Sequence, residues 1–425
     1  MAALGTIRGA DALKPASGLA LARAPGPAGG LVLGRVLGAA GALVLACSAA
    51  LAVAPPAGAY LSTRDITPFP KSSVITGASW TSPRYAPPTN QRGDILPTVW
   101  ADDGNQYTMI DDGGTDVGLA HGLWKQSVAR ITGTPPSIQL SHVGDPTQPP
   151  PHTFAQIAKD PSIWRGPLGP YYSSGLVAAN HVLYATKELN WNYNANQPFK
   201  GLQGIDYSTD NGQHWKDVDK PFPAPLGNLN WVVRGRGGSY ADGYVYAIAS
   251  EREFNASRLI MGRSRADVAD MTDPSRWQWA SGWQATVGGS FPRWSSSFAA
   301  AIPILSYQSR ITYPQMAYDS PLHRYLLSFT FTYAPKPPAM WRNGADMVLL
   351  EGPHPWGPFS FVAHEPEFGP SNGYSAGFPV KWISNNGRDL WLKWAANFDG
   401  CGPHLDCSGG YGFNYRRMHL TVAGG

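Results

Sequence analysis

The sequence feature that most constrains the fold is a succession of short apolar and aromatic runs, separated by turn residues, that continues from Asp94 onward. The chain contains 48 glycines and 39 prolines, which argues against long helices, and helical periodicity is nearly absent. Aromatic residues make up 12% of the chain and charged residues only 15%, so the chain can bury a large core. The pattern therefore predicts an all-β fold and excludes disorder and a coiled coil.

The turn residues place the expected elements along the chain. Residues 95–101 and 106–110 are predicted to form two strands joined by a tight turn at 102–105. A short helix is expected at 265–271, with Ser264 as its N-cap. The Pro-rich segments 60–92 and 134–162 lack periodicity and are expected to be wrapping loops. Further strands are expected at 182–187, 244–250, 324–331, 347–351 and 390–395.

The first 59 residues differ from the rest of the chain and contain no aromatic residue. Residues 36–54 form a 19-residue apolar stretch, and Pro55-Pro56-Ala57-Gly58-Ala59 follows it with small residues of the kind that signal peptidase accepts. We interpret residues 1–59 as an export signal cut after Ala59, and residues 60–425 as one domain. A retained membrane anchor and a lipidated Cys47 are the alternatives. Each interpretation predicts a secreted or cell-envelope protein, with the membrane involved only through this segment.

Two cysteines lie outside that segment, Cys401 and Cys407. A close, isolated pair in an exported protein is expected to form a disulfide that closes a surface loop. His404 lies between them, but a zinc site would need a fourth ligand. No cofactor is predicted. A structural Ca²⁺ remains an alternative without a specific motif.

The charge balance argues against a nucleic-acid partner. The chain has 33 basic and 29 acidic residues, and four basic residues and one acidic residue fall in the first 59 positions. The remainder is nearly neutral and has no run of Lys or Arg, whereas binding to a phosphate backbone requires concentrated positive charge. The motifs of serine hydrolases, zinc proteases and P-loop proteins are also absent from the sequence. A monomer is expected.

The most specific local pattern is residues 208–215, Ser-Thr-Asp-Asn-Gly-Gln-His-Trp. It is similar to the Asp-box of sialidase-type β-propellers, a structural turn in which Asp210 accepts backbone N–H groups, Gly212 takes a positive φ and Trp215 packs into the sheet. Looser polar-Gly turns followed by an aromatic residue recur along the chain, which predicts about five repeated sheet units. A sialidase activity is disfavoured because the Arg-Ile-Pro motif is absent.

Several segments, in this order along the chain, resemble a family of exported bacterial five-bladed β-propellers of formerly unknown function. That family includes endo-D-arabinanases, glycoside hydrolases that cut mycobacterial-type arabinan. The resemblance implies a five-bladed β-propeller and a polysaccharide substrate. The matching segments are 93–104, 107–113, 208–215, 243–246, 273–277, 325–327, 351–359 and 381–384.

Glycoside hydrolysis needs two carboxyl groups that flank the scissile bond. Asp94 directly precedes the first expected strand, and the resemblance to furanosidase propellers assigns a catalytic base to this position. Asp112 matches the acid in the family's Gly-Asp-Gly pattern, although Asp111 stands where the family has Gly; these two adjacent carboxyl groups are expected to perturb each other's pKa. We expect Asp94 and Asp112 on the base side, and Glu251 or Glu188, both at strand ends, as the general acid.

Aromatic platforms are expected beside the acids because the C–H faces of sugars pack on aromatic rings. Blade packing is the competing interpretation for each of them. The primary hypothesis is an endo-acting hydrolase of D-arabinan, and the alternative is a non-catalytic carbohydrate-binding or cell-envelope scaffold. The predicted substrate-binding residues are Asp111, Trp124, Trp191, Trp294, Arg310 and Tyr313.

Overall fold

The computed structural model describes residues 68–118, 122–144, 151–189, 201–223, 226–238, 242–252, 254–286, 289–332, 345–369, 373–396 and 410–424. The chain divides into two units, Met1–Ala52 and Val53–Gly425, and all described residues lie in the second unit. The predictions for the export signal, for Trp191 and for the Cys401–Cys407 disulfide therefore concern residues outside the described part.

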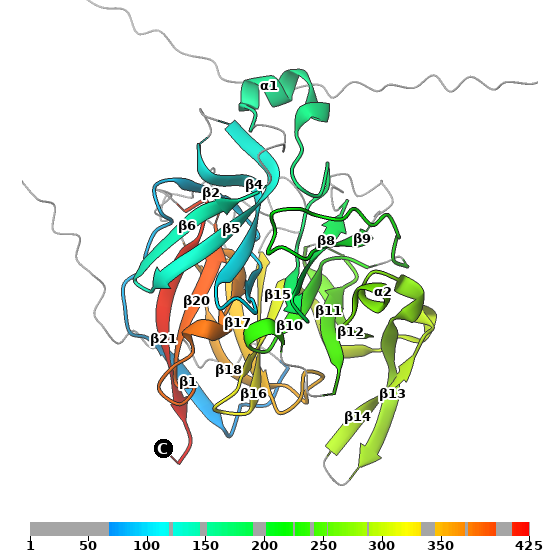
Figure 1. Cartoon of the computed structure of the whole chain (residues 1–425). Helices are drawn as coiled ribbons and strands as arrows, with labels where there is room; N and C mark the ends of the chain where they lie inside the picture. Colours follow the sequence, from blue (N-terminus) through cyan, green and yellow to red (C-terminus); the bar gives the residue numbers. More distant parts are fainter. Residues whose placement is uncertain are drawn as a thin grey trace, which may run out of the picture. The chain divides into compact units, whose positions relative to one another are not determined.

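The described chain is nearly all β, as the sequence predicts, with two short α-helices, α1 (Phe154–Lys159) and α2 (Val268–Met271) (Figure 1). The strands are β1 (Ile75–Trp80), β2 (Gln91–Asp94), β3 (Thr98–Trp100), β4 (Gln106–Gly118), β5 (Gly122–Thr134), β6 (Ser137–Val143), β7 (Leu176–Ala179), β8 (Val182–Glu188), β9 (Leu202–Ser208), β10 (Leu229–Val233), β11 (Tyr244–Ser250), β12 (Ala256–Arg265), β13 (Gln278–Thr286), β14 (Gly289–Ser295), β15 (Pro303–Asp319), β16 (Arg324–Thr332), β17 (Ala345–Gly352), β18 (Ser360–Glu365), β19 (Tyr374–Gly377), β20 (Asp389–Ala395) and β21 (Asn414–Val422).

The described strands form four sheets, within which we distinguish five consecutive groups of antiparallel strands. Group one is β2–β6, group two is β7–β9, group three is β10–β14, group four is β15–β18, and group five is β19–β21 completed by β1. Groups three and four form one nine-stranded sheet, because Val232 and Val233 of β10 pair in parallel with Met316 and Ala317 of β15. The β13–β14 hairpin extends from the end of that sheet (Figure 1).

The hydrophobic core consists of five clusters among the described residues, and each cluster lies between two groups. One cluster lies between groups one and two, and a second between groups two and three. A third lies between groups three and four, and a fourth between groups four and five. The fifth joins group five back to group one, for example through Phe413 and Ile110. Each group therefore shares an apolar cluster with the next one, and group five shares one with group one, so apolar burial holds neighbouring groups together.

β1 completes the sheet of group five by pairing with β21, where Trp80 lies opposite Met418. The expectation that residues 60–92 are only wrapping loops is therefore wrong, because this segment supplies β1 and β2. Five of the six β1 residues are buried, all except Thr76, so burial does not alternate along the strand and the pattern gave no strand signal. The same expectation fails for residues 134–162, where β6 and α1 form.

Helix α2 begins three residues later than predicted, at Val268. Its N-cap is Asp267, whose side chain accepts the Asp270 N–H, and not Ser264. The reason is that Ser264 and Arg265 remain in β12, where they pair with the beginning of β11. Sheet pairing thus overrides the local N-cap preference of the serine.

The turn at 208–215 has the hydrogen bonds that its sequence predicts. Asp210 Oδ1 accepts the His214 N–H at 2.9 Å and the Ser208 hydroxyl at 2.8 Å, and Gly212 has a φ of 90°. Trp215 packs against the cluster between groups one and two. The turn therefore fixes the connection that leaves β9.

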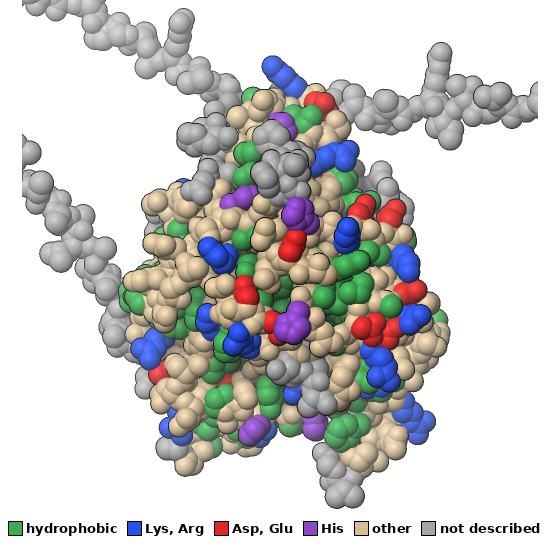
Figure 2. Space-filling model, viewed as in Figure 1, with side chains coloured by type: hydrophobic (Ala, Val, Ile, Leu, Met, Phe, Trp, Pro, Cys, Tyr) green, Lys and Arg blue, Asp and Glu red, His purple; other side chains and the backbone are tan. Residues whose placement is uncertain are grey.

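On the face shown in Figure 2, acidic and basic side chains are interspersed and do not gather in a patch of one sign. This agrees with the near-neutral composition of the chain beyond residue 59. Within the described ranges, no helix is both long and apolar enough to span a membrane.

Candidate active site

Two carboxyl groups lie side by side where β2 crosses β4. Asp94 of β2 is paired with Asp111 of β4. The strands approach so closely that a Cβ on Gly113 would lie 2.0 Å from the Arg92 carbonyl oxygen, and a Cβ on Gly93 would lie 2.5 Å from the Asp111 carbonyl oxygen. Glycine is required at both positions, because any side chain would push the two acid-bearing strands apart.

Asp112 brings a third carboxyl group into the cluster. Successive residues of a strand normally face opposite sides of the sheet, but Asp112 has a φ of 50°, in the left-handed region. This breaks the alternation, so Asp94, Asp111 and Asp112 all interact electrostatically. The Asp112 side chain is 23% exposed, whereas Asp111 is buried.

The environment separates the pKa values of two of these acids. Burial and the nearby charge of Asp112 raise the pKa of Asp94 to about 8, against the hydrogen bond from Tyr374. Burial also raises the pKa of Asp112, but only to about 6, because the Lys125 ammonium favours its ionised form. Near neutral pH, Asp94 therefore holds a proton and Asp112 is ionised. A protonated and an ionised carboxyl group in one site are the complement that acid–base catalysis requires.

Asp111 is the most enclosed of the three acids, and burial together with the charge of Asp94 raises its pKa well above the usual range. Its Oδ2 accepts the Ser173 N–H at 2.9 Å, whereas Oδ1 is buried with no hydrogen-bond partner. A carboxyl group in this position is expected to remain neutral. Asp111 thus sits behind the Asp94–Asp112 pair and is tied to the segment that precedes β7.

Tyrosine side chains surround the acids on the group-five side. The Tyr374 hydroxyl, at the start of β19, donates a hydrogen bond of 2.6 Å to Asp94 Oδ2. Its ring contacts that of Tyr313, with centroids 5.7 Å apart, so this predicted residue does lie beside the acid cluster. Tyr411 is buried near the three carboxyl groups. This burial of the tyrosine, together with the charges of the carboxyl groups, raises the pKa of its hydroxyl.

Lys125 and two aromatic rings form the opposite side. The Lys125 ammonium is 4.0 Å from Asp112 Oδ1 and lies over the Tyr172 ring at 3.3 Å and the Trp164 ring at 4.0 Å. Such stacking holds the lysine in one place while it keeps its charge. The cation can therefore stabilise the Asp112 carboxylate.

Trp124 lies on the β5 strand opposite Gly113, beside the acid cluster. Its ring packs on the open face of Gly114, where a Cβ would come within 2.7 Å, and stacks on the His142 ring with centroids 4.6 Å apart and planes 8° apart. The ring is half-buried, and these contacts fix its orientation.

Glu188 ends β8, in group two, whereas the acids lie in group one. It is fully buried, and its Oε1 accepts the Ser174 hydroxyl and, at 3.3 Å, the Leu229 N–H. Since Ser173 binds Asp111, the segment 172–174 links Glu188 to the cluster. In this structure Glu188 braces the strands of groups two and three.

Glu251 follows β11, where both of its carboxylate oxygens accept backbone N–H groups, from Ser257 at 2.8 Å and from Arg258 at 2.9 Å. The carboxylate therefore caps the beginning of β12. Trp294 packs among Tyr246, Trp356 and Arg263, and the Arg310 guanidinium lies 4.5 Å from the centre of the Phe331 ring. These contacts are with the sheets and not with the acid cluster.

Sequence reasoning missed Tyr374, Tyr411, Lys125, Tyr172 and Trp164. A usable signal existed for two of them: Tyr374 begins β19 and Tyr172 lies just before β7, so each stands at the start of a group, as Asp94 does. Lys125 occupies an ordinary strand position, and Trp164 lies in a segment expected to be a loop. Lys125 and Trp164 could be recognised only from their contact with each other in the folded chain.

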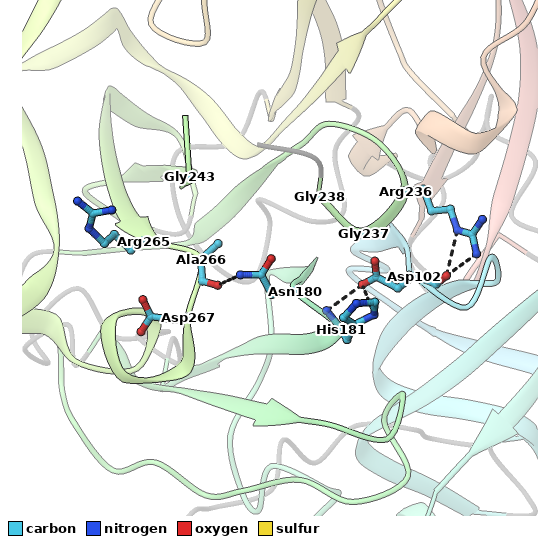
Figure 3. A pocket seen from close by; sticks show the side chains of 10 residues that line it. All are labelled: Asp102, Asn180, His181, Arg236, Gly237, Gly238, Gly243, Arg265, Ala266 and Asp267. Atoms are coloured by element: carbon cyan, nitrogen blue, oxygen red, sulfur yellow. Dashed lines mark hydrogen bonds and ion pairs between the residues drawn. The ribbon is translucent and has the colours of Figure 1, made fainter. Parts of the chain in front are cut away.

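A pocket of about 470 Å³ lies elsewhere (Figure 3). Asp102 accepts the His181 N–H at 2.9 Å, and Arg236 donates to the Asp102 carbonyl oxygen. The pocket includes the turns that precede β4, β8 and β11. Asp111 lies about 16 Å along β4 from the beginning of that strand, at a rise of about 3.3 Å per residue, so the acids lie apart from the pocket. No group of three or more His, Cys, Asp or Glu that could hold a metal ion occurs in the described ranges.

Comparisons with known proteins give no family assignment. No protein-family model matches the sequence, and no curated protein matches it. Among solved structures, the chain is similar to an alpha-L-arabinofuranosidase from Podospora anserina, with 9% identity, a TM-score of 0.41 and coverage of 79% of this chain and 94% of that one.

Two further solved structures are similar at the same level. A GH43_1 enzyme from Xanthomonas citri shows 13% identity and a TM-score of 0.43, over 80% of this chain and 92% of that one. A GH32 beta-fructofuranosidase from Bombyx mori shows 12% identity and a TM-score of 0.44, over 80% of this chain and 64% of that one. At these values the similarities assign neither a family nor an activity to this chain.

Proposed function

We propose that this chain is an exported glycoside hydrolase that cleaves a furanose polysaccharide, and that it acts internally on D-arabinan of the mycobacterial-type cell envelope. The observation that carries the proposal is the pair Asp94 and Asp112, two carboxyl groups in one site whose pKa values are separated to about 8 and about 6. The choice of D-arabinan rests on the family resemblance of the sequence segments. Export rests on the first 59 residues.

We also propose that the fold is a five-bladed β-propeller, with the acids on the first blade. Five consecutive antiparallel groups and five core clusters that close into a ring support this architecture. In such a ring, residues at the starts of several groups converge on one site. Asp94 and Tyr374, which are 280 residues apart in sequence and share a hydrogen bond, fit that arrangement.

In the proposed reaction, protonated Asp94 gives its proton to the glycosidic oxygen as the bond to the anomeric carbon breaks. Ionised Asp112, held beside Lys125, either takes a proton from a water molecule that attacks the anomeric carbon, or attacks that carbon itself to form a covalent intermediate that water then hydrolyses. The two routes give opposite anomeric configurations in the first product, which NMR can distinguish. We therefore propose Asp94 as the acid, because its pKa is the higher of the two, although the family resemblance implies a base at this position and the sequence analysis expected Glu251 or Glu188 as the acid.

The direct test is product release from the purified full chain incubated with mycobacterial arabinogalactan and with plant arabinans. A ladder of oligosaccharides from arabinogalactan, and none from plant arabinans, is the expected result. Single sugars without intermediates would contradict internal cleavage. No products from any polymer, with retained binding to one of them, would overturn the hydrolase and favour a non-catalytic carbohydrate-binding protein.

The pH dependence follows from the same pair. Activity should rise as Asp112 loses its proton near pH 6 and fall as Asp94 loses its proton near pH 8, giving a bell-shaped profile of kcat/KM. Measuring kcat/KM from about pH 4 to about pH 10 tests this. Activity that keeps increasing beyond pH 9, on the order of one unit above the upper pKa, would exclude Asp94 as the acid.

A further inference from the structure

A lysine is buried next to the turn that follows Asp94, and it forms no ion pair with a carboxylate of the described residues. Lys393 lies on β20 with 2% of its surface exposed, and its ammonium donates to the Ser375 carbonyl oxygen at 2.9 Å and to the Ile95 carbonyl oxygen at 3.4 Å. Burial alone lowers its pKa to about 7. Burying an ammonium whose partners are only carbonyl groups is unfavourable, so a methionine would serve better if the position only needed to be filled.

The room for this side chain is made by Gly377, which pairs with Lys393 across the sheet. A Cβ on Gly377 would lie 3.3 Å from the Lys393 Cε and 3.2 Å from the Gln315 Cβ. A larger residue at 377 would therefore crowd the lysine stem. The glycine keeps open the path along which the ammonium reaches the carbonyl groups.

The carbonyl group that Lys393 binds belongs to a strained turn. Ile95 has a φ of 62° and Leu96 a φ of 57°, both in the left-handed region, and Ile95 is β-branched, for which that region is strongly disfavoured. The turn is tight, since the Leu96 N–H donates to the Asp94 carbonyl oxygen at 2.8 Å. Such a conformation persists only where the surroundings hold it.

Three donors from group five hold this turn and its carboxyl group. The Ile95 carbonyl oxygen accepts the Ser375 hydroxyl as well as the Lys393 ammonium, and Asp94 Oδ2 accepts the Tyr374 hydroxyl at 2.6 Å. Lys393 also binds the Ser375 carbonyl group and thereby fixes the strand that carries the other two donors. The carboxyl group of Asp94 and the backbone that follows it are therefore both held by hydrogen bonds from β19 and β20.

We propose that Lys393 is a positioning residue for Asp94: its buried ammonium clamps the strained Ile95 turn to β19, so that the Asp94 carboxyl group stays in the hydrogen bond with Tyr374 and faces Asp112. The proposal rests on the proposed hydrolase function for its consequence in catalysis, but the geometry of the clamp is independent of the substrate. Lys393 itself touches neither the carboxyl group nor the substrate.

The test compares Lys393→Met, which keeps the volume of the stem, with Lys393→Gln, which keeps a donor. The pH titration of the Asp94 carboxyl carbon is followed by ¹³C NMR and assigned by its absence in Asp94→Asn. In Lys393→Met the midpoint should move upward by roughly half a pH unit or more, because the Tyr374 hydrogen bond that lowers the Asp94 pKa is loosened. Lys393→Gln should restore part of the shift.

Activity provides a second readout. Lys393→Met should lower kcat by about 10- to 100-fold with little change in KM, because the acid is displaced while the substrate surface remains. The matched control is Leu390→Ala, which removes a fully buried side chain from the same strand. It should lower stability but leave the Asp94 titration and the kcat of the folded protein as in the wild type.

An unchanged Asp94 midpoint in folded Lys393→Met would overturn the positioning role, and so would an equal shift in Leu390→Ala. If Lys393→Met does not fold, Lys393→Gln and Ser375→Ala carry the same test, since the serine substitution removes the other donor to the Ile95 carbonyl group. A wild-type protein that is inactive on every polymer would refute the proposed function. The NMR titration would then still decide whether Lys393 positions Asp94.

Discussion

Replacing Asp94 by Asn is expected to lower kcat on a furanose polysaccharide by about 10²- to 10⁴-fold, because the amide cannot give a proton to the leaving oxygen. Asp112→Asn should have an effect of similar size, since it removes the group that must be ionised. The rates of product release from arabinogalactan, measured near neutral pH with purified variants, provide the test. The control is Asp103→Asn, an exposed acid in the turn that precedes β4. This substitution should leave kcat unchanged.

The Asp94→Asn substitution should also show how much the buried carboxyl group lowers the stability of the folded protein at high pH. The pKa of Asp94 is raised from 3.8 to about 8 in the folded protein, so the stability that depends on its proton is complete below pH 3.8 and is lost as the pH rises through about 8. Asn cannot ionise. Asp94→Asn should therefore unfold at a higher temperature than the wild type above pH 8. Lower stability together with full activity would refute both the burial and the role of this acid.

Gly113→Ala is expected to have the second large effect, on stability and activity together. The added Cβ would lie 2.0 Å from the Arg92 carbonyl oxygen and 2.6 Å from the Gly93 Cα, both backbone atoms that a rotamer change cannot move. β2 and β4 must separate, and overpacking of this kind costs about 1–3 kcal/mol of unfolding free energy. Because these strands carry Asp94 and Asp111, the acids separate with them.

Urea unfolding and product release measure the two consequences. Gly77→Ala is the matched control, because Gly77 also lies in a strand, β1, and a Cβ there meets nothing within 4 Å. It should unfold at a urea concentration close to that of the wild type. A Gly113→Ala protein with wild-type unfolding and activity would mean that the close approach of the strands does not set the geometry of the acids.

The sequence allowed the all-β class and several strands to be predicted, because those signals are local. Alternating or apolar runs bounded by turn residues marked β8, β11 and β20 to within one residue. β1 escaped prediction because its burial depends on β21, more than 330 residues away, and not on its own pattern. The beginning of α2 was misplaced for a similar reason, since pairing with β11 extends β12 through Ser264.

The same distinction applies to the candidate site. Asp94 and Asp112 could be proposed because they flank a strand and a glycine turn that are visible in the sequence. The position of Glu251 at a strand end suggested a catalytic acid. In the structure both of its carboxylate oxygens accept backbone N–H groups from the beginning of β12. Lys393 gave no sequence signal, because its contact with the Asp94 turn arises only when groups five and one meet. Lys125 lies on the strand next to that of Asp112, but nothing in its local sequence marks it.

The pairing of β1 with β21 also determines the order in which the molecule can be completed. β1 has no partner until β21 has been synthesised, so the sheet of group five cannot be completed before the chain reaches Val422. Contacts of such high sequence separation form slowly, because the entropy of closing the loop is lost before the pairing is gained. The pairing of β1 with β21 is therefore expected to be among the late steps of folding.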